Sequence, residues 1–359
     1  MKAAVVSLNS TSSKWTAEAM RKYFDEVDEL KISDLEINIT GRTAEAFYKG
    51  VPLSEYDCIY CKGSFRYAQL LRSLTTIMQG KCYMPISPEA YTVAHDKLLT
   101  QLMLQQHNIP MPKTYISSTV KAAREILSNM NYPIIMKFPQ GTQGKGVLFA
   151  DSFGSASSIL DALSELKQSF IIQEYIDTDS CDIRAIVVGD KVVGSMMRKG
   201  SPEEKRSNIH AGGVGEPINL DETSKEIAVK AAKATGADIC AVDMLESVKG
   251  PLVIETNISP GLQGIVKATK IDIPDKIAKF LAKKTAEWLD NKKKKKNKDL
   301  MKEVQINGVD SNIITSLDYR GSRILLPEIV SKAAVLKGAD QVEIVINKDK
   351  VTLRKLNIS

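Results

Sequence analysis

Three oxygen-bearing side chains near one turn signal could together hold a divalent cation. Glu255 and Asn257 stand two residues apart in the apolar segment PLVIETN, and side chains two apart on a strand share a face. If the chain turns about Lys249, Asp243 of the preceding segment ICAVDMLE lies directly opposite Glu255. Two carboxylates this close repel each other unless a cation lies between them, and rigid oxygen ligands suit Mg²⁺. A hairpin with a polar exposed face is the alternative. Because no lysine on this face neutralises the two carboxylates, we favour the metal site.

The glycine-rich segment GTQGKG, residues 141–146, is a candidate phosphate-binding loop. It differs from the Walker A pattern, because Val147 stands where that pattern needs Ser or Thr. It also joins two predicted strands, whereas a P-loop opens a helix. A glycine-rich hairpin can still cover phosphates with its backbone N–H groups, as in protein kinases. An ordinary surface hairpin explains the segment equally well.

Two lysines occupy positions that call for an anionic partner. Lys137 interrupts the apolar run PIIMKFP, where an unpaired ammonium is costly to bury. Lys97 falls in the first turn of a predicted helix, where the macrodipole disfavours a cation. A nucleoside triphosphate under the glycine-rich loop accounts for both lysines.

Arginines gather around a predicted hairpin over residues 182–199. Arg184 and Arg198 lie within it, and Arg206 opens the segment RSNIHAGG at 206–213. Guanidinium groups and backbone donors in such a loop can bind oxyanions. A solvated basic loop is the ordinary alternative.

Composition and charge place these residues in a multidomain enzyme. The chain has 359 residues, of which 43% are hydrophobic and 26% charged, as expected for a soluble globular protein. No 18-residue apolar run predicts a membrane helix, and no secretory signal is recognisable at the start. Five cysteines, an odd number, favour a reducing cytoplasm. Six of the lysines fall within residues 292–298 and account for the whole net charge of +6, so the bulk charge does not predict a nucleic-acid-binding face.

Alternating hydrophobic patterns predict a Rossmann-like layer at the start, without the GxGxxG fingerprint of a dinucleotide site. The cysteines of its CxxC, Cys58 and Cys61, point to opposite faces of a strand, which favours burial over metal binding. Further patterns predict strands and helices through the centre of the chain. The predicted strands are 3–8, 57–63, 133–139, 146–150 and 169–176, and the predicted helices are 16–24, 96–108, 155–167, 224–235 and 274–289.

Taken in order, the motifs from about residue 85 to 288 resemble the ATP-grasp ligases of the RimK type, the alpha-L-glutamate ligase family. The resemblance implies an α/β and α+β fold, in which two lobes clamp ATP beside an N-terminal Rossmann-like domain. The matching segments are DK at 96–97, MKFPQGTQGKGV at 136–147, QEYI at 173–176, DIRAIVVGDKVVG at 182–194, RSNIHAGG at 206–213, AVDML at 241–245 and ETNISPGLQGI at 255–265.

The resemblance also implies a role for each motif. The ATP-binding residues would be Lys97, Lys137, Gly141, Gln143, Gly144, Gly146, Glu174, Tyr175, Ile176, Asp182, Arg206, Ser207 and Asn208. The metal ligands would be Asp243, Glu255 and Asn257, holding two Mg²⁺ ions, with Mn²⁺ as a substitute. The catalytic residues would be Arg184, Arg198, Arg206 and Asn208, with Arg184 or Arg198 binding the acceptor carboxylate.

The implied reaction converts a carboxylate and ATP into an acyl phosphate, which an amine attacks to form an amide. Family members that share the sequence SPGLQGI add glutamate to the C-terminus of a ribosomal protein or to a glutamylated coenzyme, which the resemblance implies for this chain. A nucleotide-sensing, nucleic-acid-associated regulator is the alternative function. Because every expected metal and phosphate residue is present, we favour the ligase.

The end of the chain, residues 318–356, resembles an AbrB-type half-barrel, which implies a homodimer. Such domains often bind DNA, but acidic residues dilute the charge of this one, so we favour oligomerisation alone. The expected domains are a Rossmann-like domain at 1–93, a lid lobe at 94–176, a metal-binding lobe at 177–288, a lysine-rich linker at 289–304 and an AbrB-like domain at 305–359.

Overall fold

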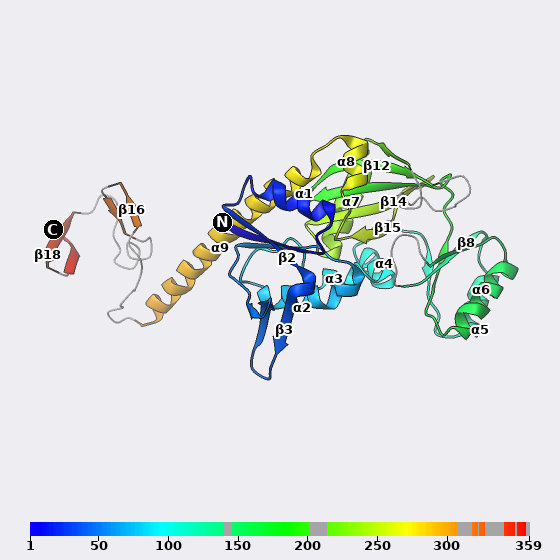
Figure 1. The fold of residues 1–359 in the computed structure, drawn as a ribbon, viewed down its shortest axis with the longest axis horizontal. Coiled ribbons are helices and arrows are strands. Elements are labelled where there is room, and N and C mark those ends of the chain that lie inside the picture. The colour runs from blue at the N-terminus through cyan, green and yellow to red at the C-terminus, as the bar shows by residue number, and fades with distance from the viewer. Residues whose placement is uncertain are drawn as a thin grey trace. The chain divides into compact units, whose positions relative to one another are not determined.

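The protein is described from a computed structural model in which the chain forms two compact units, Met1–Thr285 and Ala286–Ser359 (Figure 1). No helix in the described part of the chain is long and apolar enough to span a membrane. The described residues are 1–139, 146–200, 214–307, 318–321, 323–326, 341–348 and 350–356.

The N-terminal layer is built on a parallel sheet, as the sequence predicted, with strands in the order β2-β1-β6. Helix α1 begins earlier than the predicted residue 16, because the Ser10 side chain caps it by accepting from the Ser13 N–H. The expected burial of Cys58 and Cys61 is confirmed, and both are free thiols. The elements of this layer are β1 (Lys2–Ser7), α1 (Thr11–Met20), β2 (Glu26–Lys31), β3 (Leu35–Ile39), β4 (Ala44–Tyr48), β5 (Val51–Pro52), β6 (Cys58–Cys61), α2 (Ala68–Met78) and α3 (Ala90–Val93).

A separate lobe follows helix α4 (Lys97–Gln106) and has its own apolar core. Helices α5 (Val120–Ser128) and α6 (Phe153–Glu165) pack side by side against its antiparallel sheet (Figure 1). The strands are β7 (Thr114–Tyr115), β8 (Ile134–Lys137), β9 (Val147–Ala150) and β10 (Ile171–Glu174), in the order β7-β10-β8-β9. The buried core residues are Ala123, Leu127, Ile134, Met136, Ala150, Ala156, Leu160, Leu163 and Ile172.

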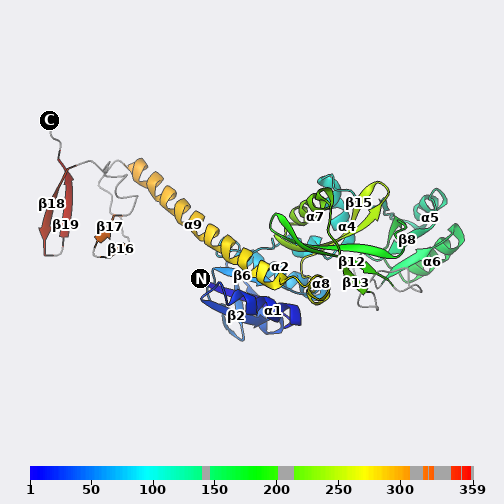
Figure 2. The same ribbon diagram turned by 90° about the horizontal axis from the view of Figure 1, so that it is seen from above.

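A five-stranded antiparallel sheet forms the centre of the first unit, in the order β13-β12-β11-β14-β15. The predicted hairpin at 182–199 is confirmed, and Gly189 takes the left-handed conformation that its turn requires. The elements are β11 (Cys181–Val188), β12 (Lys191–Lys199), β13 (Val214–Pro217), α7 (Glu222–Thr235), β14 (Ile239–Ser247), β15 (Gly250–Asn257) and α8 (Gln263–Thr269). Figure 2 shows α7 beside this sheet.

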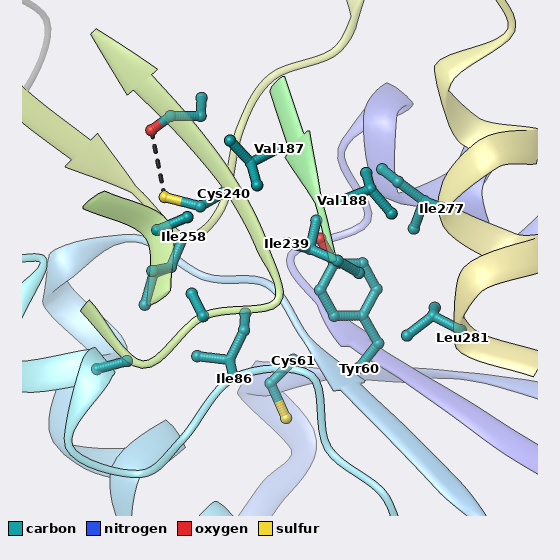
Figure 3. Close-up of a cluster of buried hydrophobic side chains, with 14 of the residues drawn as sticks. Tyr60, Cys61, Ile86, Val187, Val188, Ile239, Cys240, Ile258, Ile277 and Leu281 are labelled. Atoms are coloured by element: carbon teal, nitrogen blue, oxygen red, sulfur yellow. Dashed lines mark hydrogen bonds between the residues drawn. The ribbon is translucent and has the colours of Figure 1, made fainter. Parts of the chain in front are cut away.

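The N-terminal layer and the central sheet share one continuous hydrophobic core. Figure 3 shows the Tyr60 ring of β6 beside Ile239 of β14, with Ile277 and Leu281 of helix α9 (Ile273–Asn307) near the same ring. All four side chains are 0% exposed. The lobe carrying β8 thus has a hydrophobic core separate from this larger one.

The hairpin β14–β15 confirms that Asp243 pairs with Glu255, although the turn lies elsewhere than expected. Ser247 pairs with Gly250, which leaves a two-residue turn, and Met244 pairs with Val253. The register then shifts by one residue, and this bulge brings Asp243 opposite Glu255. The sequence thus predicted the right pair through a simpler hairpin than the real one.

Helix α9 (Ile273–Asn307) continues well past the predicted end at Leu289. The lysine-rich segment, expected to be a linker, is therefore helical, and Lys292–Lys295 are exposed. Beyond it the second unit contains β16 (Asp318–Arg320), β17 (Arg323–Leu325), β18 (Val342–Asn347) and β19 (Lys350–Lys355), paired as two antiparallel hairpins. Residues 327–340 fall outside the described part of the chain, so the resemblance of 318–356 to an AbrB-type half-barrel stays a prediction.

The separate core of the lobe predicts its sensitivity to truncation. Leu160 is fully buried in that core, so Leu160→Ala should destabilise the lobe by about 2–5 kcal/mol. Hydrogen exchange should then accelerate in β8–β10 and α6 while the central sheet stays protected. Leu166→Ala removes the same atoms from a side chain that is 66% exposed and should change stability by less than about 0.5 kcal/mol. Equal acceleration in both sheets would contradict two independent cores.

Candidate active site

The three predicted metal ligands lie on two neighbouring strands. Asp243 of β14 is cross-strand partner to Glu255 of β15, and Asn257 ends β15 opposite Ala241. Directly paired residues of an antiparallel ladder project from the same face, so the two carboxylates are neighbours. The Asn257 amide oxygen Oδ1 accepts a hydrogen bond from the Ser259 N–H at 2.9 Å. The structure therefore brings the predicted ligand set together.

Two arginines hold the Asp243 carboxylate. Arg184 donates from Nε to Oδ1 at 2.8 Å and from Nη2 to Oδ2 at 2.6 Å, and Arg198 donates from Nη2 to Oδ2 at 2.8 Å. Burial alone would raise the pKa of Asp243, but Arg184 and then Arg198 outweigh it and hold the pKa at about 2. Asp243 is thus ionised at any physiological pH, although it is only 3% exposed.

Arg198 also forms an ion pair with Asp182 across β11 and β12. Its Nε donates to Asp182 Oδ1 at 2.7 Å, and its Nη2 donates to Oδ2. Both side chains are at least 90% buried. Burial opposes the charge of Arg198, yet Asp243 and Asp182 raise its pKa. One continuous ion-pair network thus joins Asp182, Arg198, Asp243 and Arg184, in that order.

Lys97 and Lys137 act electrostatically on Glu255 from two other elements. Lys97 is the first residue of α4, where the Asp96 side chain caps the helix, and its backbone N–H donates to Pro139 O at 2.9 Å. Lys137 is the last residue of β8. Burial lowers the pKa of Lys97, against the opposing attraction of Glu255 and Asp96. Burial, and then the charge of Lys97, lower the pKa of Lys137 to about 8.

Glu255 lies at the electrostatic centre of this group. Burial, and then the charge of Asp243, raise its pKa, while Lys97 and Arg184 act in the opposite direction. Within the described part of the chain, no hydrogen bond uses the Glu255 carboxylate, so its lone pairs are available to a cation. A divalent cation would relieve the repulsion between the two carboxylates.

The described residues assigned to the nucleotide are divided between the lobe and the central sheet. Asp182 lies on β11 and pairs with Arg198, whereas Gly146, Glu174, Tyr175 and Ile176 lie at or next to the ends of β9 and β10 in the lobe. Gly146 has a φ of +78°, and a Cβ there would lie 2.3 Å from Phe138 Cδ2, so the base of the hairpin requires glycine. Glu174 Oε1 accepts from the Lys113 N–H at 2.7 Å. The Tyr175 ring packs edge-on against Phe149, with centroids 5.3 Å apart, and Ile176 follows it. These contacts position the segment 174–176 beside the β8–β9 hairpin.

Several predicted residues fall outside the described part of the chain, so their roles stay predictions. They are Gly141, Gln143 and Gly144 of the glycine-rich loop and Arg206, Ser207 and Asn208 of the basic loop.

The donor set fits a hard divalent cation in its chemistry. Two carboxylates and one amide offer oxygen atoms only, which suits Mg²⁺ and leaves coordination positions for water and phosphate. The described residues contain no cluster of three or more His, Cys, Asp or Glu side chains with a metal-binding arrangement. The site thus supplies an incomplete protein shell, as expected where a nucleotide provides further oxygens.

Neither arginine's partner was predicted from the sequence. The pairing of Asp182 with Arg198 depends on a bulge near Val187, because the Gly189-Asp190 turn alone would place Asp182 opposite Met197. The pairing of Arg184 with Asp243 depends on β11 lying beside β14, which no local pattern indicates. One of the two, Arg184 or Arg198, was expected to bind the acceptor carboxylate, and in the structure both donate to protein carboxylates.

The buried network predicts a large difference between neighbouring cations. Arg198→Met leaves Asp182 buried without its partner and should lower the free energy of unfolding by roughly 3–5 kcal/mol in urea titrations. Lys199→Met removes the neighbouring ammonium group, whose ion pair with Glu216 at 3.1 Å is exposed. This change should alter the free energy of unfolding by less than about 1 kcal/mol. Similar small losses in both variants would show that the network contributes little to folding.

Comparison with known proteins agrees with this geometry. A family model described as the RimK-like ATP-grasp domain matches residues 94–281. A probable alpha-L-glutamate ligase from Vibrio cholerae is 34% identical over 294 residues, which is 80% of this chain and 97% of the relative. One from Pseudoalteromonas atlantica is 35% identical over 292 residues, 79% of this chain and 96% of the relative.

Solved structures show the same fold at lower identity. The ATP-grasp ligase PsnB, complexed with a phosphomimetic variant of minimal precursor, Mg and ADP, has a TM-score of 0.63 and 16% identity, covering 79% of this chain and 98% of that one. A RimK domain ATP-grasp protein from Sphaerobacter thermophilus has a TM-score of 0.60 and 16% identity, covering 78% and 99%. With a matching family model and relatives that align along nearly their whole length, the chain belongs to the RimK-like ATP-grasp ligases, enzymes that form C–N bonds.

Proposed function

We propose that the protein joins L-glutamate to an acceptor carboxylate as an amide, using ATP and Mg²⁺. The acceptor is a protein C-terminus or a glutamylated coenzyme. The observation that carries the proposal is the pairing of Asp243 with Glu255, with Lys97 and Lys137 beside them. The relatives named as probable alpha-L-glutamate ligases support glutamate as the amine.

In this proposal Asp243, Glu255 and Asn257 hold the Mg²⁺, while Lys97, Lys137 and the loop from 141 to 146 bind the phosphates. Bound MgATP supplies the phosphoryl group that activates the acceptor carboxylate. Lys97 and Lys137 come from different cores, one beside the central sheet and one in the lobe, so a polyanion between them draws the two bodies together. Such closure excludes the water that would hydrolyse an activated carboxylate.

The Asp182–Arg198 pair holds Asp243 in its ionised, oriented form. Arg184 is the more exposed of the two arginines, with 15% of its side chain accessible against 8% for Arg198. We therefore assign the oxyanion-binding role to Arg184 and a positioning role to Arg198. Arg206, Ser207 and Asn208 complete the phosphate side of the site in this proposal.

The decisive measurement is ADP release from the purified protein with MgATP and each amino acid in turn, with mass spectrometry of the products. We expect stimulation by glutamate and products that carry added glutamate. Glu255→Gln should lower turnover by at least about 10²-fold, because it removes one charge from the ligand set. A regulator that only senses nucleotide would bind MgATP and release no ADP with any amino acid.

Glu246→Gln is the matched control for that substitution. Glu246 lies on the same hairpin but next to its turn, where it is exposed and pairs with Pro251. Its turnover should stay within about two-fold of the wild type, since an exposed charge has little effect at a distance. Wild-type turnover in Glu255→Gln would contradict the proposed metal site.

We also propose that the second unit pairs with a second copy of the chain. In the hairpin β18–β19, Ile344 pairs with Leu353 and Ile346 pairs with Val351, which forms one apolar face. Ile346 is 74% exposed and Val351 64% exposed. A two-stranded hairpin cannot bury such a face alone, and a symmetric partner offers the same face in return.

Ile346→Lys in the full chain tests this pairing. We expect the mass measured by light scattering to fall from dimer to monomer, because a charge replaces the most exposed apolar side chain of the face. Glu343→Lys changes the opposite face of the same strand and should leave the dimer intact. A monomeric wild type, or a dimer unaffected by Ile346→Lys, would overturn the proposal. Binding of DNA by the monomer would favour a nucleic-acid partner instead.

A further inference from the structure

The proposed metal ligand Asn257 occupies the last position of its strand. Beyond it, residues 258–262 form no helix or strand before α8 begins at Gln263. The start of α8 has no side-chain cap of its own. The ladder that orients Asp243 therefore ends at Asn257, and the following loop must decide how that amide points.

The N-terminal layer holds this loop at three points. The Gly63 N–H donates to Ser259 Oγ at 2.9 Å, and Lys62 Nζ donates to Pro260 O at 3.2 Å. The Leu262 N–H donates to Ser12 Oγ at 2.8 Å. Lys62 and Gly63 directly follow β6, and Ser12 lies in the first turn of α1. The contacts thus join the end of the parallel sheet to the residues after Asn257.

Lys62 makes its contact from an unfavourable environment. The side chain is 4% exposed, and burial lowers its pKa to about 8. Its ammonium lies 5.7 Å from the centre of the Tyr60 ring, a weak compensation for lost hydration. An apolar side chain of similar length would avoid that desolvation. Stability alone therefore gives no reason for a lysine here, whereas fixing the Pro260 carbonyl does.

A single residue connects this anchor to the amide. Ser259 accepts from Gly63 through its side chain and donates to Asn257 Oδ1 through its backbone. Gly63 packs closely against its neighbours, because a Cβ there would lie 2.6 Å from Leu71 Cδ1. The anchor reaches the proposed ligand in two hydrogen bonds.

We infer that Ser259 is a positioning residue for Asn257, and that Lys62 supports it by fixing the next carbonyl. The inference rests on the proposed function, in which Asn257 binds the metal. It assigns the N-terminal layer a role in setting the metal affinity of a site that lies on the central sheet. Partners that orient a metal ligand typically change metal affinity or activity by 10–100-fold when they are lost.

The test compares Ser259→Ala with Ser259→Thr in the full chain. We expect Ser259→Ala to raise the Mg²⁺ concentration for half-maximal ADP release by about ten-fold, at the lower end of that range, with kcat at saturating Mg²⁺ within about two-fold of the wild type. The dissociation constant of MgADP, measured by calorimetry, should rise by a similar factor. Ser259→Thr keeps Oγ and should restore both values. Lys62→Met should act in the same direction as Ser259→Ala.

Tyr23→Phe is the matched control, since it also removes one hydroxyl between the N-terminal layer and the rest of the unit. The Tyr23 hydroxyl donates to Asp275 of α9, away from the loop at 258–262, and Asp275 keeps its ion pair with Lys22. Its Mg²⁺ dependence should match the wild type. Equal shifts in Tyr23→Phe and Ser259→Ala would reduce the effect to general loosening and overturn the inference.

Glu255→Gln separates this inference from the proposed function. If Glu255→Gln is inactive while Ser259→Ala matches the wild type in Mg²⁺ dependence and MgADP binding, the positioning role is wrong and the metal site stands. If Glu255→Gln keeps wild-type turnover, the metal site itself is wrong, whatever Ser259→Ala does.

Discussion

The site depends on the mutual repulsion of two carboxylates, Asp243 and Glu255, that a β-ladder forces to face each other. In water such a pair would separate, but neighbouring strands allow no such movement. The protein must therefore supply positive charge around them. Arg184 and Arg198 hold Asp243, and Lys97 and Lys137 approach Glu255. With four cations around the three carboxylates Asp182, Asp243 and Glu255, the site as a whole carries an excess of positive charge, which suits a nucleotide polyanion that brings a divalent cation with it.

These four cations come from two parts of the chain that have separate hydrophobic cores. The arginines lie on the central sheet, in the larger core, whereas Lys137 belongs to a lobe with a core of its own. The carboxylates thus lie in the part with the larger core, and part of the proposed phosphate-binding charge lies in the lobe with the smaller core. Two separate cores are compatible with the closure proposed for this site, which would exclude water from the reaction.

The N-terminal layer, by contrast, shares its hydrophobic core with the central sheet. Tyr60 packs against Ile239 of the central sheet (Figure 3). Lys62 and Gly63, which follow β6, donate hydrogen bonds to the loop that follows Asn257. The layer therefore belongs mechanically to the carboxylate half of the site. This arrangement explains how a domain without a nucleotide fingerprint can still influence the metal end of the reaction.

The sequence alone determined the strands and helices with strong periodicity, because each follows from local alternation and turn signals. It predicted the pair Asp243–Glu255 from a symmetric turn, whereas a bulge in β14–β15 sets that pair in the structure. It misplaced the start of α1, which a serine cap decides, and the end of α9, where exposed lysines remain helical. Only the tertiary structure decided that Arg184 and Arg198 serve Asp243 and that Lys62 and Gly63 reach the loop beyond Asn257. These contacts join residues about 45 to 200 positions apart, and their geometry depends on which strands and layers pack together, which no spacing along the chain encodes.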